Sequence, residues 1–223
     1  EKDPALLQSL PECLRSTPAG AALLLVEFDG TDGRTGNDLG RLTGLLEGAV
    51  TGLATADTES ERDNLWKIRR SCSQAMFTLA PRKLNEDVVV PFHQETALLD
   101  FLEELRKATG LPTPTFGHAA DGNFHAHLMF DDADEEESRR AAEGVDALMR
   151  RVIDLGGAIS GEHGIGLAKT PYLRLQHGEA EIKAMQAVKS ALDPANILNP
   201  GKMWTPCEVH RLPRETVRLP WDH

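Results

Sequence analysis

One short stretch of the sequence constrains the fold more than any other, because it carries His118, His125 and His127 around the dipeptide Asp121-Gly122. An Asp-Gly pair flanked by extended sequence is typical of the tight turn of a β-hairpin. Residues two apart on a strand point to the same face, so His125 and His127 share a face, and the turn brings His118 back toward them. We therefore expect a hairpin from about Thr113 to Phe130 that gathers imidazoles on one side.

Strand-like and helix-like patterns alternate along the rest of the chain. Apolar runs predict a buried first strand at Ala22–Phe28 and a second strand at Asp87–Val90, which Pro91 stops. Helices are predicted near Ala5–Leu14, after a cap at Asn37, over Glu59–Phe77, from Leu98 to Gly110, from the acidic start Asp131–Glu137 onward, and before a stop at Asp193-Pro194. The last helix is expected to turn four apolar residues inward: Ile182, Met185, Val188 and Leu192. This order predicts an α+β fold with helices on one face of an antiparallel sheet, in a ferredoxin-like unit that is either single or duplicated.

A second segment of interest joins a carboxylate to an imidazole: Glu162 and His163 are adjacent in a glycine-rich bend from Gly157 to Gly166. Two hairpin histidines and Glu162 would make three protein ligands with one open position, the arrangement of a catalytic divalent-metal site. Zinc is the first candidate, then manganese or cobalt. His163 would then be free to accept a hydroxyl proton. The structural alternative is that backbone or water satisfies the histidines, and that the bend is a simple turn with Glu162 and His163 in solvent.

The charge balance restricts the partners. The 35 acidic and 24 basic residues give a net charge of −11, which opposes the phosphate neutralisation that nucleic-acid binding needs. An acidic substrate would need a local positive group, from a metal or from a buried Arg or Lys. Arg69 and Ser73 lie one turn apart on a predicted helix and could face such a substrate.

The cysteines and the hydropathy indicate the setting. Cys13, Cys72 and Cys207 are odd in number and far apart, so neither a disulfide framework nor a thiolate metal site is expected, and a reducing compartment is the simplest inference. No apolar run is long enough for a membrane span, and no secretory signal is visible.

Three motifs together resemble a known family. The residues from His118 to His125 resemble Gly-His-x-Gly-Asp-Gly-Asn-x-His, and those from Ser160 to Gly166 resemble Ser-Gly-Glu-His-Gly-x-Gly. The ending from Leu192 to Lys202 resembles Asp-Pro-x-x-x-Leu-Asn-Pro-Gly-Lys, with Leu65–Arg69 and Glu86–Pro91 before it. These motifs, in this order, are those of the flavin-linked oxidases related to D-lactate dehydrogenase, the glycolate oxidase flavin subunit and D-2-hydroxyglutarate dehydrogenase. The resemblance covers roughly residues 20–203.

The resemblance implies roles for individual side chains. His118, His125 and Glu162 would ligate the metal, and His163 would take the proton from the substrate hydroxyl. Arg69 resembles the helix arginine that pairs with the substrate carboxylate, a surface ion pair being the alternative. Weaker candidates for the same pocket are Ser73, Lys83, Asn123 and His127, and Asn199 is expected near the flavin unless its segment is a plain turn.

Two positions depart from the family pattern. Ala120 stands where the motif has Gly, which requires a negative φ at that residue. His127 stands where some relatives carry Asn, so the distal part of the substrate is expected to differ, or the ring adds a third imidazole near the metal.

The resemblance also implies a division of labour. Residues 1–203 would form the C-terminal cap domain and residues 204–223 an irregular tail, with the N-terminal FAD-binding domain absent from this chain. FAD would be held mainly by that domain, in the same chain or in a partner chain, and an electron-transfer subunit is a further expected partner. The cytoplasm is the expected location, with inner-membrane attachment through partners as an option.

The predicted function is the substrate- and metal-binding half of a dehydrogenase or oxidase that converts a D-2-hydroxy acid of the lactate, glycolate or 2-hydroxyglutarate type into the 2-keto acid. The isolated chain is expected to be inactive. The alternatives are a flavin-independent metal hydrolase built on the same histidines and carboxylate, and a non-catalytic subunit of an oxidoreductase complex.

Overall fold

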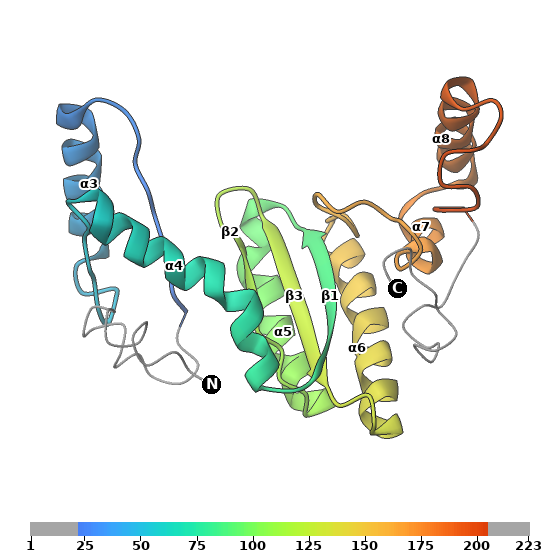
Figure 1. Cartoon of the computed structure of the whole chain (residues 1–223), viewed down its shortest axis with the longest axis horizontal. Helices are drawn as coiled ribbons and strands as arrows, with labels where there is room; N and C mark the ends of the chain where they lie inside the picture. Colours follow the sequence, from blue (N-terminus) through green and yellow to red (C-terminus); the bar gives the residue numbers. More distant parts are fainter. Residues whose placement is uncertain (1–21, 205–223) are drawn as a thin grey trace. The chain divides into compact units, whose positions relative to one another are not determined.

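The computed structural model describes residues 22–204, which separate into two compact units with the boundary after Ala75. The helix predicted near Ala5–Leu14 and nearly all of the expected tail lie outside the described residues. Figure 1 shows both units.

The first unit contains two helices, α3 (Asp32–Leu46) and α4 (Glu59–Ala75). α3 begins five residues before the predicted cap at Asn37, and Thr31 precedes it without a side-chain capping bond. α4 begins where the pattern predicted, because Thr58 and Glu61 exchange hydrogen bonds: the Glu61 backbone N–H donates to the Thr58 hydroxyl at 3.3 Å, and the Thr58 N–H donates to the Glu61 carboxylate at 3.0 Å.

The predicted strand at Ala22–Phe28 is wrong. The segment forms no strand, and Leu23 and Leu24 are 56% and 62% exposed. An apolar run becomes a strand only when another edge satisfies its backbone groups, and no ladder to this run forms among residues 22–204.

The second unit is built on a three-stranded antiparallel sheet in the order β1-β3-β2, with β1 at Arg82–Val89, β2 at Thr115–His118 and β3 at Asn123–Phe130. Helix α5 (Glu95–Thr109) follows β1, and α6 (Glu135–Asp154) follows β3. Both helices lie against the same face of the sheet (Figure 1). The β-α-β-β-α order confirms the predicted α+β, ferredoxin-like packing; one such unit lies within the described residues, and its duplication stays a prediction.

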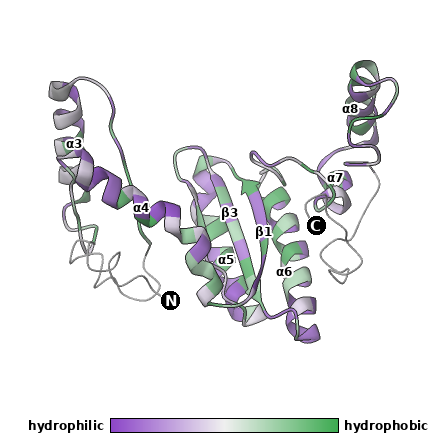
Figure 2. Cartoon of the chain, viewed as in Figure 1, coloured by the Kyte–Doolittle hydropathy of each residue, from purple (hydrophilic) through white to green (hydrophobic). Residues whose placement is uncertain are grey.

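The core lies between the sheet and these two helices. Val88, Ala126 and Leu128 are fully buried on the helix-facing side of the strands and pack with residues such as Leu98 and Leu148 from α5 and α6. Figure 2 shows that β1 is hydrophilic over much of its length and apolar at its arrowhead. Polar residues therefore remain available on the opposite face of the sheet.

The turns match the pattern. Gly122 has φ +73°, and a side chain there would collide with the carbonyl of Val90, so only glycine fits this hairpin turn. Ala120 is not among the residues with positive φ, which meets the condition set by its departure from the family motif. Gly110 ends α5 in the left-handed conformation, as predicted.

The C-terminal part differs from the pattern in two ways. A short helix α7 (Thr170–Gln176), which the sequence pattern did not indicate, precedes α8 (Glu179–Leu192). On α8 only Ile182 is fully buried, whereas Val188 and Leu192 are exposed, so the prediction of an inward apolar face is wrong for those two. Helical spacing indicates a face but cannot indicate whether another element covers it.

Candidate metal centre

The pairing of β1 with β3 places a carboxylate beside a histidine. Asp87 on β1 is the register partner of His125 on β3, so their side chains point to the same face of the sheet, away from α5 and α6. The glycine-rich bend joins them because Ala158 exchanges two backbone hydrogen bonds with Val89, at 3.1 and 2.8 Å, and so fixes the bend beside β1.

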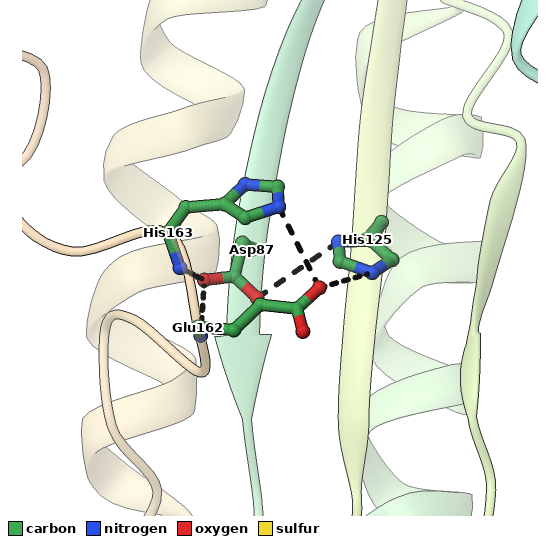
Figure 3. Close-up of side chains that lie close together, drawn as sticks. All are labelled: Asp87, His125, Glu162 and His163. Atoms are coloured by element: carbon green, nitrogen blue, oxygen red, sulfur yellow. Dashed lines mark hydrogen bonds and ion pairs between the residues drawn. The ribbon is translucent and has the colours of Figure 1, made fainter.

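The buried carboxylate of Asp87 holds the bend in place. Its Oδ2 accepts hydrogen bonds from the Ser160 hydroxyl at 3.1 Å and from the backbone N–H groups of Gly161, Glu162 and His163 at 2.9 Å each. The Ser160 hydroxyl in turn accepts from the N–H of Gly164 at 2.7 Å. The bend therefore curls around one carboxylate oxygen, as Figure 3 shows for its last two N–H donors.

Four side chains meet at this point (Figure 3): Asp87, His125, Glu162 and His163 each offer one ligand atom, and these atoms lie within 4.8 Å of one another. The Glu162 Oε1 lies 3.3 Å from His125 Nε2 and 3.6 Å from His163 Nε2. The rings of His125 and His163 are stacked with their centroids 5.1 Å apart. Imidazole nitrogens and carboxylate oxygens are ligand atoms that suit a divalent cation of the zinc or manganese type, so members of this cluster could hold one.

The cluster has a buried side and an open side. Asp87 and His125 are buried, whereas the side chains of Glu162 and His163 are 52% and 48% exposed. A small molecule could therefore approach from the side of the bend.

His118, the other predicted ligand, lies next to this cluster. It ends β2 and is exposed, and its ring meets that of His125 edge to face with centroids 5.9 Å apart. The hairpin thus brings His118 and His125 side by side, and ligation by His118 stays a prediction.

The local electrostatics favour neutral imidazoles and an ionised Asp87. Burial lowers the pKa of His125, although the charge of Asp87 partly opposes this. Burial likewise lowers the pKa of His127 to about 4. The pKa of Asp87 is lowered to about 2: burial would raise it, but the N–H groups of His163 and Glu162 and the charge of Lys169 outweigh that effect. Neutral imidazole is the form that binds metals.

Three predicted pocket residues lie on the strands of the second unit. Asn123 is buried, and its Oδ1 has no hydrogen-bond partner among the described residues. His127 is buried beside Phe116, with its Nδ1 3.0 Å from the carbonyl oxygen of Pro114. Lys83 is half-buried, with its ammonium 5.2 Å from the centre of the Phe77 ring, and burial lowers its pKa.

Three other predicted residues belong to other elements of the chain. Arg69 and Ser73 are on α4 of the first unit, one turn apart as expected, with Arg69 half-buried and Ser73 exposed. Asn199 is exposed with φ +46° in a turn after α8, a conformation that Asn tolerates.

Sequence reasoning missed Asp87 as a member of the site. One signal could have identified it: a charged residue followed directly by Val88-Val89-Val90 is expected to be buried, and a buried carboxylate requires hydrogen-bond donors or a counter-charge. Lys169, only 4% exposed, supplies the counter-charge, because its ammonium donates to the main-chain oxygen of Asp87 and lies 3.8 Å from Oδ2.

The fold and the cluster define an α+β domain with a candidate divalent-cation centre open on one side. The family model described as FAD linked oxidases, C-terminal domain, matches residues 6–203, and the chain belongs to this family.

Curated relatives agree with this assignment. The chain is 36% identical over 184 residues to the glycolate oxidase subunit GlcD of Bacillus subtilis, with 82% of this chain and 39% of that protein covered. It is 33% identical over 199 residues to the D-lactate dehydrogenase of Anaerostipes hadrus, with 88% and 42% covered. For the GlcD subunit of Escherichia coli K12 the identity is 34%, with 81% and 36% covered. The chain thus spans about two fifths of the length of these relatives.

No helix in the described part of the chain combines the length and the apolar character needed to cross a bilayer.

Proposed function

We propose that this chain is the substrate- and metal-binding half of an FAD-dependent dehydrogenase or oxidase that converts a D-2-hydroxy acid of the lactate, glycolate or 2-hydroxyglutarate type into the 2-keto acid. The observation that carries the proposal is the meeting of His125, Glu162 and His163 beside Asp87. The names of the relatives support the substrate class, since they are glycolate oxidase subunits and D-lactate dehydrogenases.

The residues fit a divalent cation. The Oε1 atom of Glu162 lies 3.3 Å from Nε2 of His125, and the ring of His118, the predicted third ligand, lies beside that of His125. Zinc is our first candidate for this site. A bound divalent cation would supply the positive charge that attracts the substrate's carboxylate and hydroxyl oxygens in a protein of net charge −11.

We assign the base to His163. Its imidazole is half exposed and adjoins Glu162, so its Nε2 can reach a hydroxyl group placed at the open side of the cluster. It would accept the hydroxyl proton while the C2 hydride leaves for the flavin. Asn123 and His127 would line the site on β3 with Lys83 from β1, and Arg69 with Ser73 would bind the substrate carboxylate.

FAD itself is proposed to be held mainly by a separate FAD-binding domain, in the same chain or in a partner chain. Residues 22–204 contain no strand, glycine-rich turn and helix in the order that binds a dinucleotide pyrophosphate: Pro91 follows β1, and acidic residues follow β3. Asn199 is proposed to approach the flavin. We also propose an electron-transfer subunit as a partner, and a cytoplasmic setting with inner-membrane attachment through partners.

The test uses the FAD-containing assembly isolated through a tag on this chain. Reduction of an artificial electron acceptor is measured with D-lactate, glycolate and D-2-hydroxyglutarate. His163→Ala should lower kcat by about 100-fold or more while a substrate still binds, because general-base catalysis typically contributes about 10²–10⁴ in rate. His93→Ala is the matched control, since His93 is an exposed histidine in a short 3-10 helix outside the cluster.

Three results would contradict the proposal. Wild-type turnover in the His163→Ala assembly would remove the base assignment. Ester hydrolysis by the metal-loaded chain without any electron acceptor would favour a hydrolase, and isolation of the tagged chain without flavin would favour a non-catalytic subunit.

A further inference from the structure

The Asp87 carboxylate contacts both halves of the candidate centre with its two oxygen atoms. Oδ2 accepts the hydrogen bonds of the bend, and Oδ1 faces His125. We propose that Asp87 is the positioning residue of this centre: it shapes the bend that carries Glu162 and His163, and it orients the ring of His125. The part that concerns the cation rests on the proposed function, whereas the part that concerns the bend does not.

The bend converges on one atom of Asp87. Three consecutive N–H groups, of Gly161, Glu162 and His163, point at Oδ2 and leave the bend little freedom to change its backbone angles. The Ser160 hydroxyl closes the bend at its two ends, because it donates to Oδ2 and accepts from the Gly164 N–H. Removal of the carboxylate would leave these donors without their acceptor.

The two nitrogens of the His125 ring face different carboxylates. Its Nε2 lies 3.3 Å from Glu162 Oε1, whereas its Nδ1 lies 3.8 Å from Asp87 Oδ1. The two nitrogens of an imidazole point in divergent directions, so a cation bound at Nε2 would leave Nδ1 to face Asp87. We assign Asp87 as a partner of the ligand histidine, because its Oδ1 faces Nδ1 of the ring and its Oδ2 is occupied by the N–H groups of the bend. Such partners fix the tautomer and the orientation of metal-binding histidines.

Two unsatisfied atoms support this reading. Neither Asp87 Oδ1 nor His125 Nδ1 has a hydrogen-bond partner among the described residues, although both atoms are buried. A buried polar atom is costly without a partner, and a small rotation of the ring would join the two. We expect the 3.8 Å gap to close to hydrogen-bond distance when a cation holds Nε2.

The charge of Asp87 is stabilised for this role. Asp87 has no exposed surface, and the Lys169 ammonium approaches it from a buried position.

The experiment compares Asp87→Ala and Asp87→Asn with the wild-type chain by two measurements. The first is backbone amide hydrogen exchange at Gly161, Glu162 and His163 in the metal-free chain. The second is the dissociation constant for Zn²⁺ alone, by calorimetry. Asp87→Ala should speed exchange at these amides and weaken Zn²⁺ binding by about 10–100-fold, the usual effect of losing the outer partner of a ligand.

Asp87→Asn separates the two roles. Its amide oxygen can still accept from the bend, but its NH₂ group then faces His125 Nδ1 and cannot accept from it. Exchange should stay close to wild type while Zn²⁺ binding weakens. The matched control is Asp193→Asn, another buried carboxylate, which accepts the N–H groups of Ile197 and Leu198 and should leave both measurements unchanged.

The outcomes distinguish a failure of this inference from a failure of the proposed metal site. Wild-type exchange and wild-type Zn²⁺ affinity in Asp87→Ala would overturn the inference. If the wild-type chain binds no Zn²⁺ but Asp87→Ala still exposes the three amides, Asp87 positions the bend and the proposed metal site fails. If the amides of β3 lose their protection from exchange in Asp87→Ala, that variant does not fold, and Ser160→Ala is measured instead. Faster exchange at the Gly164 amide together with weaker Zn²⁺ binding would support the inference, and wild-type values of both would refute it.

Discussion

The tightest approach within the candidate centre is between Gly161 and Asn123, and it permits a sharp prediction. A β-carbon added at Gly161 would lie 2.7 Å from Asn123 Cγ and 2.9 Å from Nδ2, and closer still to Oδ1. Ordinary contacts of a β-carbon begin near 3.4 Å, so about 0.5–1 Å of displacement is required. Asn123 is buried on β3, and the bend is held by Asp87, so neither side moves freely.

Gly161→Ala should therefore destabilise the chain by about 1–3 kcal/mol, the usual cost of overpacking a filled site. The free energy of unfolding is measured by urea titration for Gly161→Ala, Asn123→Ala and the double variant. Asn123→Ala removes the three atoms that the new methyl group would meet, so the double variant should cost less than the sum of the two single changes.

Gly164→Ala is the matched control for this cycle. It lies in the same bend with nothing within 4 Å of an added β-carbon, and its cost should come only from its φ of +78°. It should show no coupling to Asn123→Ala. If the losses in the free energy of unfolding for Gly161→Ala and Asn123→Ala are strictly additive, the added methyl group does not meet the Asn123 side chain and the prediction is refuted.

Three further predictions concern stability. Burial raises the pKa of Glu86 from 4.5 to about 7, so between these two pH values the folded chain binds more protons than the unfolded chain. The free energy of unfolding should therefore fall as the pH rises through this range, and Glu86→Gln should remove this pH dependence in urea titrations. Lys169→Met should cost about 3–5 kcal/mol, because it leaves Asp87 buried without its counter-charge; an unchanged urea midpoint would show that the ammonium is dispensable. Leu128→Ala should cost about 2–5 kcal/mol at a fully buried position on the central strand, whereas the exposed Leu45→Ala should cost almost nothing; equal losses in thermal denaturation would contradict the described core.

Short-range features of this protein could be predicted from the sequence because they depend on neighbouring residues. The Asp121-Gly122 turn, the shared face of His125 and His127, and the end of α5 at Gly110 all follow from local backbone geometry. The adjacency of Glu162 and His163 in a bend was equally visible, and so was the family resemblance that the family match confirms.

The sequence by itself therefore determined the type of most elements, the hairpin and three members of the site. Only the tertiary structure decided that Ala22–Phe28 forms no strand and that Val188 is exposed, because burial depends on which other elements are present to cover a face. It also decided the place of Asp87, whose hydrogen-bond partners lie 73 to 76 residues further along the chain. No local pattern can encode a contact of that range, since it exists only once β1 and the glycine-rich bend are brought together by folding.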